Sequence, residues 1–423
     1  MNKTLLLTTA KVYFLKLAIV VIGFAIVAGL ARNVEPSALG DYFWLLSFAS
    51  VAAVVLRFGR DNLLVKQMAN AVELERHRFV KQALGVVLKL SVVHICIVLS
   101  LYFTEYITLK EKMLGIAMLP PLVAVLSVFG YWAQAAKQAE LQQLLNAAPR
   151  LLSGIAVLFA LWFYDYTVSL SIALIFTAVS VALLCITYLF VSQPAKSDNH
   201  LTQADSATEV LRSAPNYARY LMIALCSTIM MEGAVLLAGL LTEAAEVAKL
   251  AVVVRIVSVV SFILLAFNAV LMPEFAVLAK RDNAQDIRML FQKSRNVSLL
   301  SALFVAMLVL VIHKPVLSFF GQFFESSNHI LFALLCVQLV KVVVGPTGQL
   351  LMMSGYERIQ QYSLMFSCVS LTVFGLTLIP TYGALGAAYA LLIAVSVNNF
   401  TGLYFCVKHY QVPWLPFVKV RSV

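Results

Sequence analysis

Long apolar stretches recur along the whole chain, and each is about 20 residues long, enough to cross the roughly 30 Å hydrocarbon core of a bilayer. With 62% hydrophobic residues, 12% charged residues and a mean hydropathy of +0.91, the chain also lacks the polar surface that a soluble domain needs. We therefore predict an all-α polytopic membrane protein with about twelve spanning helices. The expected spans are 12–30, 42–65, 83–103, 113–133, 150–164, 168–191, 217–241, 249–272, 297–312, 329–353, 362–379 and 387–407.

A polar break at 192–216 divides these spans into two groups of six. Its first residues, SQPAKSD, are typical of a flexible linker. The groups echo each other, because Ala-Gly-Leu closes the first span at Ala28–Leu30 and the seventh at Ala238–Leu240. Duplicated halves with the substrate site between them are a common transporter plan. The predicted domains are an N-terminal six-helix bundle (1–191), a cytoplasmic linker (192–216), a C-terminal six-helix bundle (217–407) and a cytoplasmic tail (408–423).

Basic residues are divided unevenly between the two sides of the membrane. If the N-terminus is cytoplasmic, most loop Lys and Arg residues, Arg288 and Arg295 among them, lie on the cytoplasmic side. The opposite side then carries only Arg32, Lys110, Lys112 and Lys314. By the positive-inside rule we expect both termini in the cytoplasm. The net charge of +11 mostly reflects this bias and does not indicate nucleic-acid binding, since the basic residues are spread over many short loops.

Charged residues inside the expected spans are the main clue to function, because each costs several kcal/mol unless it faces water or a partner. Lys16 and Lys89 lie one to two turns from a helix end, and Arg255 is similarly placed toward the opposite face. These three side chains can either reach the membrane surface by snorkelling or contact a substrate. The sequence leaves both alternatives open.

The deepest charges are Arg57, Glu232 and Lys341. Arg57 and Asp61 are four residues apart and can pair on one helix face, which leaves Arg60 as excess positive charge. Lys341 lies one turn before Gly345, beside an expected kink. Glu232 either neutralises a cation of another helix or takes part in ion coupling, and Asp61 is a second candidate for coupling.

The charges inside the membrane are mostly positive, so we expect a cavity that favours an anionic solute, such as a pyrophosphate or an acidic sugar, over lipophilic cations. The candidate substrate-binding residues are Lys341, Arg57, Arg60, Lys89, Arg255 and Lys16.

Two expected spans at corresponding places in the halves carry helix-disrupting residues. The fourth span contains Pro120 and Pro121, and the tenth contains Gly345 and Pro346. Proline removes a helix hydrogen bond and clashes with the preceding turn, so we predict kinks at both places. Matched interruptions in two halves point to a transport site, although proline is also simply tolerated in membrane helices.

Sequence motifs for chemistry do not occur. The chain has no G-x-x-x-x-G-K-[ST] phosphate loop, no H-E-x-x-H zinc motif and no G-x-S-x-G nucleophile motif. Its six cysteines fall in or beside apolar spans without C-x-x-C spacing, so no metal site or cofactor is expected. These absences favour a transporter over an enzyme.

Four segments, in order along nearly the whole chain, resemble one known family. They are AGLARNVEPSALGDYFWLLSF (Ala28–Phe48), LMPEFAVLAKRDNAQDIRMLFQKSRN (Leu271–Asn296), GPTGQLLMMSGYE (Gly345–Glu357) and IPTYGALGAAYA (Ile379–Ala390). They are similar to segments of the polysaccharide transporter family, the Wzx-type O-antigen flippases of the multidrug/oligosaccharidyl-lipid/polysaccharide (MOP) exporter superfamily.

The resemblance implies a MATE-like two-bundle transporter in the bacterial cytoplasmic (inner) membrane. It implies that a polyprenyl-pyrophosphate-linked sugar repeat unit is moved from the cytoplasmic to the outer leaflet by alternating access, with coupling to H⁺ or Na⁺. A polysaccharide polymerase and a chain-length regulator are candidate partners. Two other functions remain open from the residues: a MATE-like small-molecule or drug antiporter, which should show deep acids instead of cations, and a membrane-embedded polysaccharide polymerase or ligase.

Overall fold

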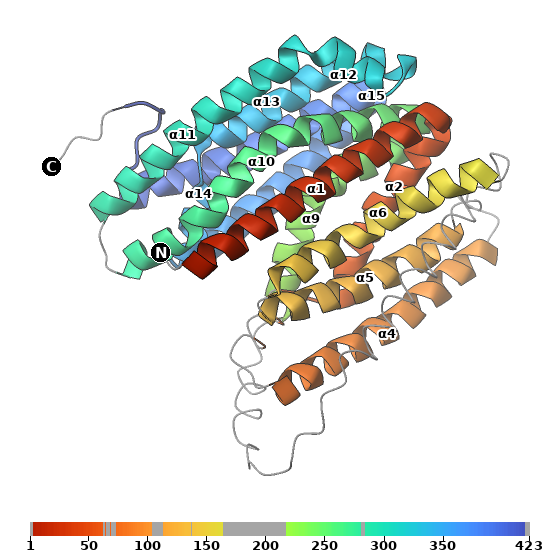
Figure 1. Ribbon diagram of the computed structural model, residues 1–423, viewed down its shortest axis with the longest axis horizontal. Coiled ribbons are helices and arrows are strands. Elements are labelled where there is room, and N and C mark those ends of the chain that lie inside the picture. Colours follow the sequence, from red (N-terminus) through yellow and green to blue (C-terminus); the bar gives the residue numbers. More distant parts are fainter. Residues whose placement is uncertain are drawn as a thin grey trace. The chain divides into compact units, whose positions relative to one another are not determined.

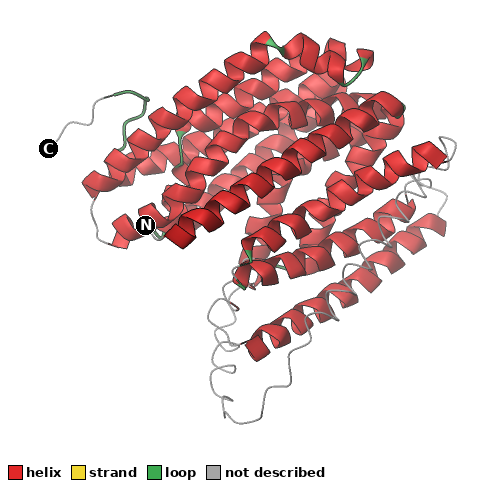
Figure 2. Cartoon of the chain, in the orientation of Figure 1, coloured by secondary structure: helices red, strands yellow, loops and turns green. Residues whose placement is uncertain are grey.

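The computed structural model describes residues 3–61, 64, 68, 73–103, 113–136, 138–163, 217–280 and 284–418. Within these residues every regular element is a helix, as Figures 1 and 2 show. The all-α prediction is therefore confirmed. The predicted span 168–191 and the predicted linker 192–216 lie outside the described residues.

The chain divides into two compact units. The first comprises residues 1–34 and 45–228, and the second comprises residues 35–44 and 229–423. Two helices, α2 (Pro36–Arg57) and α9 (Tyr217–Leu241), contribute residues to both units. The division therefore passes within these helices.

The first unit is built from long helices that pack side by side. It contains α1 (Lys3–Asn33), α4 (Glu73–Phe103), α5 (Met113–Ala135) and α6 (Ala139–Phe163), together with parts of α2 and α9. Helix α5 packs between α4 and α6, and α6 also packs against α1 (Figure 1). Aliphatic residues of α2 and α4 surround Phe129 of α5 to form the core.

The second unit holds the remaining helices. They are α10 (Ala244–Lys280), α11 (Ala284–Val311), α12 (His313–Phe319), the 3₁₀ helix η2 (Gln322–Ser327), α13 (Asn328–Val344), α14 (Thr347–Met353) and α15 (Glu357–Tyr410). Helices α10, α11 and α13 pack against one another, and α15 packs against α13 and α14. At one end of this unit a core cluster joins Phe275 of α10, Phe291 of α11, Leu350 of α14 and Cys406 of α15.

Helix α15 contains a sharp turn. Its residue Gly383 adopts φ +56°, a conformation that L side chains rarely take. The carboxylate of Glu246 accepts a hydrogen bond from the N–H of Ala384 at 3.2 Å, directly after the turn. Ser363 donates to the carbonyl oxygen of Asn398 at 2.9 Å, so the two arms of α15 lie antiparallel. These arms account for the predicted spans 362–379 and 387–407.

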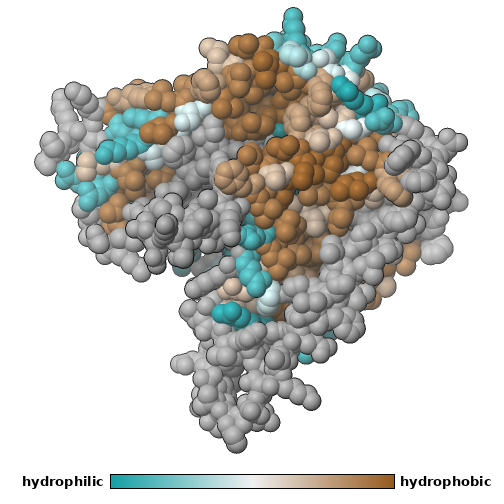
Figure 3. All heavy atoms as spheres, in the orientation of Figure 1, coloured by the Kyte–Doolittle hydropathy of each residue, from teal (hydrophilic) through white to brown (hydrophobic). Residues whose placement is uncertain are grey.

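Eight described helices are long and apolar enough to cross a membrane. Large apolar side chains remain exposed along them, for example Phe304 (74% exposed) on α11 and Phe366 (64%) on α15. Figure 3 shows apolar residues over the sides of the described helices and hydrophilic residues toward their ends. In a soluble protein these apolar side chains would be exposed to water, which is unfavourable. A surface of this kind is instead expected to face the lipid chains of a bilayer.

Candidate functional site

An ion pair joins Arg57 to Asp61 at the end of α2. The Nε atom of Arg57 donates to Oδ1 of Asp61, and Nη2 lies 3.3 Å from Oδ2. Both residues are buried, with exposed fractions of 5% and 4%. The sequence predicted this pair on one helix face, but α2 ends at Arg57, where Phe58 (φ +49°) and Gly59 (φ +72°) turn the backbone. The pair therefore bridges a turn, and its two charges neutralise each other.

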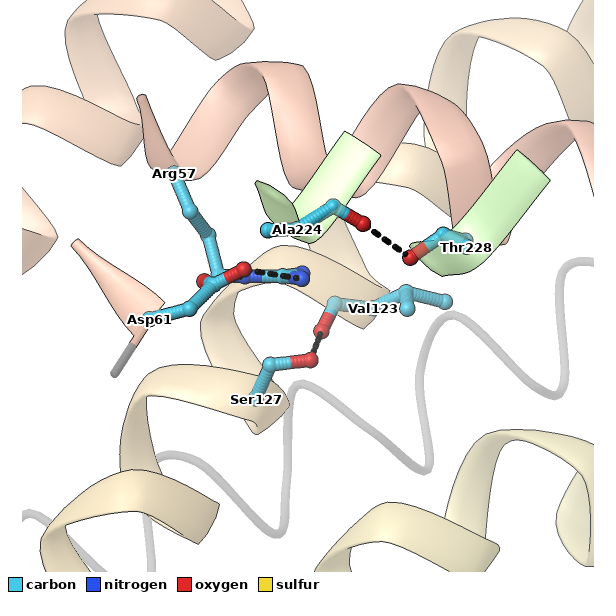
Figure 4. Close-up of polar contacts among 6 residues, drawn as sticks. All are labelled: Arg57, Asp61, Val123, Ser127, Ala224 and Thr228. Atoms are coloured by element: carbon cyan, nitrogen blue, oxygen red, sulfur yellow. Dashed lines mark hydrogen bonds and ion pairs between the residues drawn. The ribbon is translucent and has the colours of Figure 1, made fainter. Parts of the chain in front are cut away.

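The surroundings of this pair are polar and aromatic. The guanidinium carbon of Arg57 lies 5.9 Å from the ring centroid of Tyr131 on α5. Figure 4 shows the pair beside α5 and α9, which carry the hydroxyls of Ser127 and Thr228. Each hydroxyl donates to a carbonyl oxygen of its own helix, at 2.7 Å and 2.9 Å. Each hydroxyl thus donates its proton within its own helix, and its oxygen can still accept a hydrogen bond from another group.

Arg60 supplies positive charge that Asp61 does not neutralise. Its guanidinium carbon lies 4.9 Å from the ring centroid of Tyr217, at the start of α9. No carboxylate within the described part of the chain forms an ion pair with Arg60. The side chain is half-buried. The first unit thus presents one arginine paired with acid and a second stacked on an aromatic ring.

Lys341 occupies the last turn of α13, next to a complete break in the helix. Gly345 follows with φ +90°, and Pro346 lacks an N–H, so α13 ends at Val344 and α14 restarts at Thr347. The Lys341 side chain is half-buried. Among the residues that the structure describes, it has no hydrogen-bond or ion-pair partner for its ammonium group. It is thus a cation whose charge no salt bridge of the described residues neutralises.

The two predicted interruptions differ in form. Pro120 and Pro121 lie inside α5, which runs as one helix from Met113 to Ala135. Gly345 and Pro346 separate two helices outright. The predicted role of the four residues as hinges stays a prediction.

Arg255 and Glu232 both belong to the second unit. The guanidinium carbon of Arg255 lies 5.6 Å from the ring centroid of Phe43, and Glu232 is buried in α9 with 7% exposed. Both side chains have interaction partners within the structure. Neither is a free charge, and the choice between pairing and ion coupling for Glu232 stays open.

The two shallow lysines differ in their surroundings. Lys16 is half-buried on α1, whereas Lys89 lies on the exposed face of α4 with Leu88 and Val92. That position fits the snorkelling alternative for Lys89, because a long side chain on a lipid-facing surface can extend to the headgroups.

Arg295 is the buried charge that sequence reasoning missed. We expected it in a cytoplasmic loop, but it lies on α11 and is 0% exposed. Its Nη1 donates to the carbonyl oxygen of Pro413 at 2.9 Å, and Nη2 donates to that of Leu415. These carbonyls belong to the segment after α15. No local sequence motif predicts this contact, because the carbonyl groups that accept from Arg295 lie more than a hundred residues away in the sequence.

Residues that could bind a metal do not cluster in the described part of the chain: no group of three or more His, Cys, Asp or Glu side chains forms there. The polar groups described above are the Lys341 ammonium, several guanidinium groups, the hydroxyls of Ser127 and Thr228, and the carboxylates of Asp61 and Glu232. The ammonium and guanidinium groups can bind anionic ligands, and the hydroxyls can bind hydroxylated ones.

Solved structures with a similar fold are membrane transporters. The lipid II flippase MurJ in an inward closed conformation aligns with a TM-score of 0.63 and 13% identity, over 94% of this chain and 87% of that one. An inward-facing multidrug resistance MATE family transporter of the MOP superfamily aligns with a TM-score of 0.61 and 14% identity, over 94% and 98%. A MOP superfamily transporter from Pyrococcus furiosus aligns with a TM-score of 0.58 and 13% identity, over 95% and 96%. At such identities the likeness shows the fold alone.

Comparison with curated protein sequences finds no match. The sequence profile of one family, described as polysaccharide biosynthesis protein, matches residues 8–279, which is more than half of the chain. This match covers the described residues of the first unit from residue 8 onward and ends one residue before the end of α10. The chain therefore belongs to the polysaccharide biosynthesis protein family and has the fold of the MOP superfamily transporters.

Proposed function

We propose that this protein is a flippase for a lipid-linked oligosaccharide with an anionic pyrophosphate linkage. It moves the repeat unit of an O-antigen or exopolysaccharide from the cytoplasmic to the outer leaflet by alternating access. The family supports a role in polysaccharide biosynthesis, and the fold, shared with a lipid II flippase and with MATE transporters, supports transport. The observation that carries the proposal is the Lys341 ammonium beside the α13–α14 break.

The physical argument concerns the cost of a buried cation. An ammonium in a spanning segment loses hydration and must be compensated by water or by an anion. Lys341 has no carboxylate partner in the described residues, so the compensation has to come from outside them. A pyrophosphate group offers negatively charged oxygens with strong acceptor capacity.

The first unit contributes differently to the proposal. Arg57 is neutralised by Asp61, so its role is to hold the end of α2 rather than to attract an anion. Arg60 keeps its charge and lies on the ring of Tyr217. We assign Arg60 to passenger binding and leave Asp61 as a structural partner. Coupling to H⁺ or Na⁺ is proposed for Glu232, the buried acid of α9.

The main alternative is a small-molecule antiporter, because a multidrug resistance MATE transporter shares the fold. Polarity of the binding region separates the two functions. The Pyrococcus furiosus transporter is described as having a binding pocket of reverse polarity that suggests a different function. A cationic Lys341 disfavours lipophilic cations by direct repulsion and favours an anionic lipid.

Glycan display in cells tests the proposal. In cells whose surface glycan depends on this protein, Lys341→Ala should abolish display at unchanged membrane abundance, and Lys341→Arg should retain much of it. Lys314→Ala, at an exposed lysine on α12, is the matched control and should display normally. Normal display with Lys341→Ala would contradict the proposal. If display is lost and the same cells lose efflux of cationic dyes, the antiporter alternative gains instead.

We also propose the bacterial inner membrane as the location, and a polysaccharide polymerase and a chain-length regulator as partners. Both follow from the proposed passenger, which has to be built on one side of that membrane and polymerised on the other.

A further inference from the structure

The segment after α15 folds back as a strap against α11; the strap comprises residues 411–418. The strap begins where Gln411 takes φ +52° and ends the helix. Nε of Arg288 donates to the carbonyl oxygen of Tyr410 at 3.2 Å, just before the strap. Nη2 of the same residue donates to Oε1 of Gln411 at 2.9 Å. Arg288 thus fixes the point at which the chain turns back.

The main chain of the strap supplies most of its contacts with α11. Arg295 donates to the carbonyl oxygens of Pro413 and Leu415. The backbone N–H of Phe417 donates to Oδ1 of Asn296 at 3.1 Å. Gln292 also donates to a backbone carbonyl, that of Val418. Because these bonds use backbone groups, the strap side chains are left to point elsewhere.

Arg295 packs closely at this attachment. It is fully buried, and its side-chain carbons lie 3.0–3.2 Å from the position of a Cβ atom built on Gly345. One residue of the strap is also buried, Val412 at 1% exposed, within the core cluster that contains Phe291. The strap is therefore packed against the core at this end of the second unit.

The remaining large side chains of the strap are exposed and apolar. The exposed fractions are 51% for Trp414, 66% for Leu415, 55% for Phe417 and 46% for Val418. All four follow the end of α15, so a membrane-spanning helix does not account for their exposure. Together these four side chains form a small exposed apolar surface, which is stable only in contact with an apolar environment.

The depth of the strap along α11 indicates which environment that is. The part of α11 from Asn296 to Val311 rises about 23 Å at 1.5 Å per residue. With Val311 at one boundary of a hydrocarbon core of about 30 Å, Asn296 lies within about one and a half helical turns of the other boundary. The strap is bonded to Asn296 and Arg295, so it lies at the same level. Tryptophan is one of the side chains enriched at this level.

Positive charge lies at the same end of the second unit as the strap. Lys293 on α11 and Lys408 on α15 are exposed there. Apolar and aromatic residues combined with lysines are the composition that binds a membrane surface with anionic headgroups. We propose that the strap is an interfacial anchor, in which Trp414, Leu415 and Phe417 insert between lipids while the lysines contact anionic headgroups. This inference does not depend on the identity of the transported molecule.

Fluorescence quenching in proteoliposomes tests the anchor. Emission of the wild type minus that of Trp414→Phe isolates the Trp414 signal. We expect this signal to be quenched by phosphatidylcholine brominated near the headgroup, more weakly by lipid brominated at the chain end, and hardly by aqueous iodide. Adding phosphatidylglycerol to the vesicles should increase the lipid quenching. The double variant Trp414→Phe/Phe417→Trp moves the reporter along the strap and should behave alike.

Three results would overturn the proposal. Quenching by iodide but not by brominated lipid would place the strap in water. Quenching by neither would mean that protein, such as a second copy of this chain, covers it. Equal quenching with and without phosphatidylglycerol would remove the role of anionic lipid.

Discussion

Replacing Asp61 by Asn leaves the Arg57 guanidinium buried with its carboxylate removed. The structure places Nη2 of Arg57 3.3 Å from Oδ2 of Asp61. At an effective dielectric constant of about 20, two unit charges at that separation attract by about 5 kcal/mol. The neutral amide keeps one acceptor, so we expect Asp61→Asn to lower the free energy of unfolding by about 3–5 kcal/mol, the range for breaking a buried pair. The value is large because both groups are almost fully enclosed.

Unfolding of the purified protein in mixed detergent measures this loss. Removing both charges in Arg57→Met/Asp61→Leu should recover most of the stability, because no unpaired charge then remains buried. Glu140→Gln is the matched control: this acid is exposed in the first turn of α6 of the same unit and should change stability little. A loss below about 1 kcal/mol for Asp61→Asn would refute the reasoning, since that is the range of an exposed pair.

Three further substitutions test other parts of the structure. Gly345→Ala should destabilise the protein by about 1–3 kcal/mol in the same unfolding assay, because φ is +90° there and a Cβ would lie 3.0 Å from the Arg295 side chain; unchanged stability would mean that the break adapts. Glu246→Gln should lower the free energy of unfolding by about 1 kcal/mol, because the ion pair with Lys249 at 2.7 Å is lost and the hydrogen bond from the Ala384 N–H is weakened. An unfolding curve like that of the wild type would count against a stabilising role for Glu246. Glu232→Gln should make transport in proteoliposomes insensitive to an imposed proton gradient while passenger binding persists, and a retained response would exclude coupling through this residue.

Much of the fold follows from hydropathy, and the departures have identifiable causes. Apolar length predicts where helices cross the membrane, and the break at Gly345–Pro346 follows from backbone chemistry at those two residues. Hydropathy does not indicate how far helices extend beyond the bilayer. Helix α10 accordingly runs from Ala244 to Lys280, beyond both ends of the expected span 249–272.

The charged residues were harder to place from the sequence. The spacing of Arg57 and Asp61 correctly indicated a pair, although positive φ values at Phe58 and Gly59 put a turn between them. Burial of Arg295 could not be predicted, since it depends on backbone carbonyls of the strap and not on a neighbouring acid. Local spacing reports contacts within a turn of helix, while contacts across the fold need the structure.

Binding of a defined passenger to purified protein tests the central claim most directly. Two ligands with the same oligosaccharide and polyprenyl chain should be compared, one with the pyrophosphate linkage and one with an uncharged linkage. A charge-assisted hydrogen bond is worth about 1.5–3 kcal/mol, so wild-type protein should bind the anionic ligand roughly 10- to 100-fold more tightly. Lys341→Ala should reduce that preference, whereas Lys314→Ala should keep it. Equal affinity of the wild type for the two ligands would contradict an anionic passenger bound at Lys341.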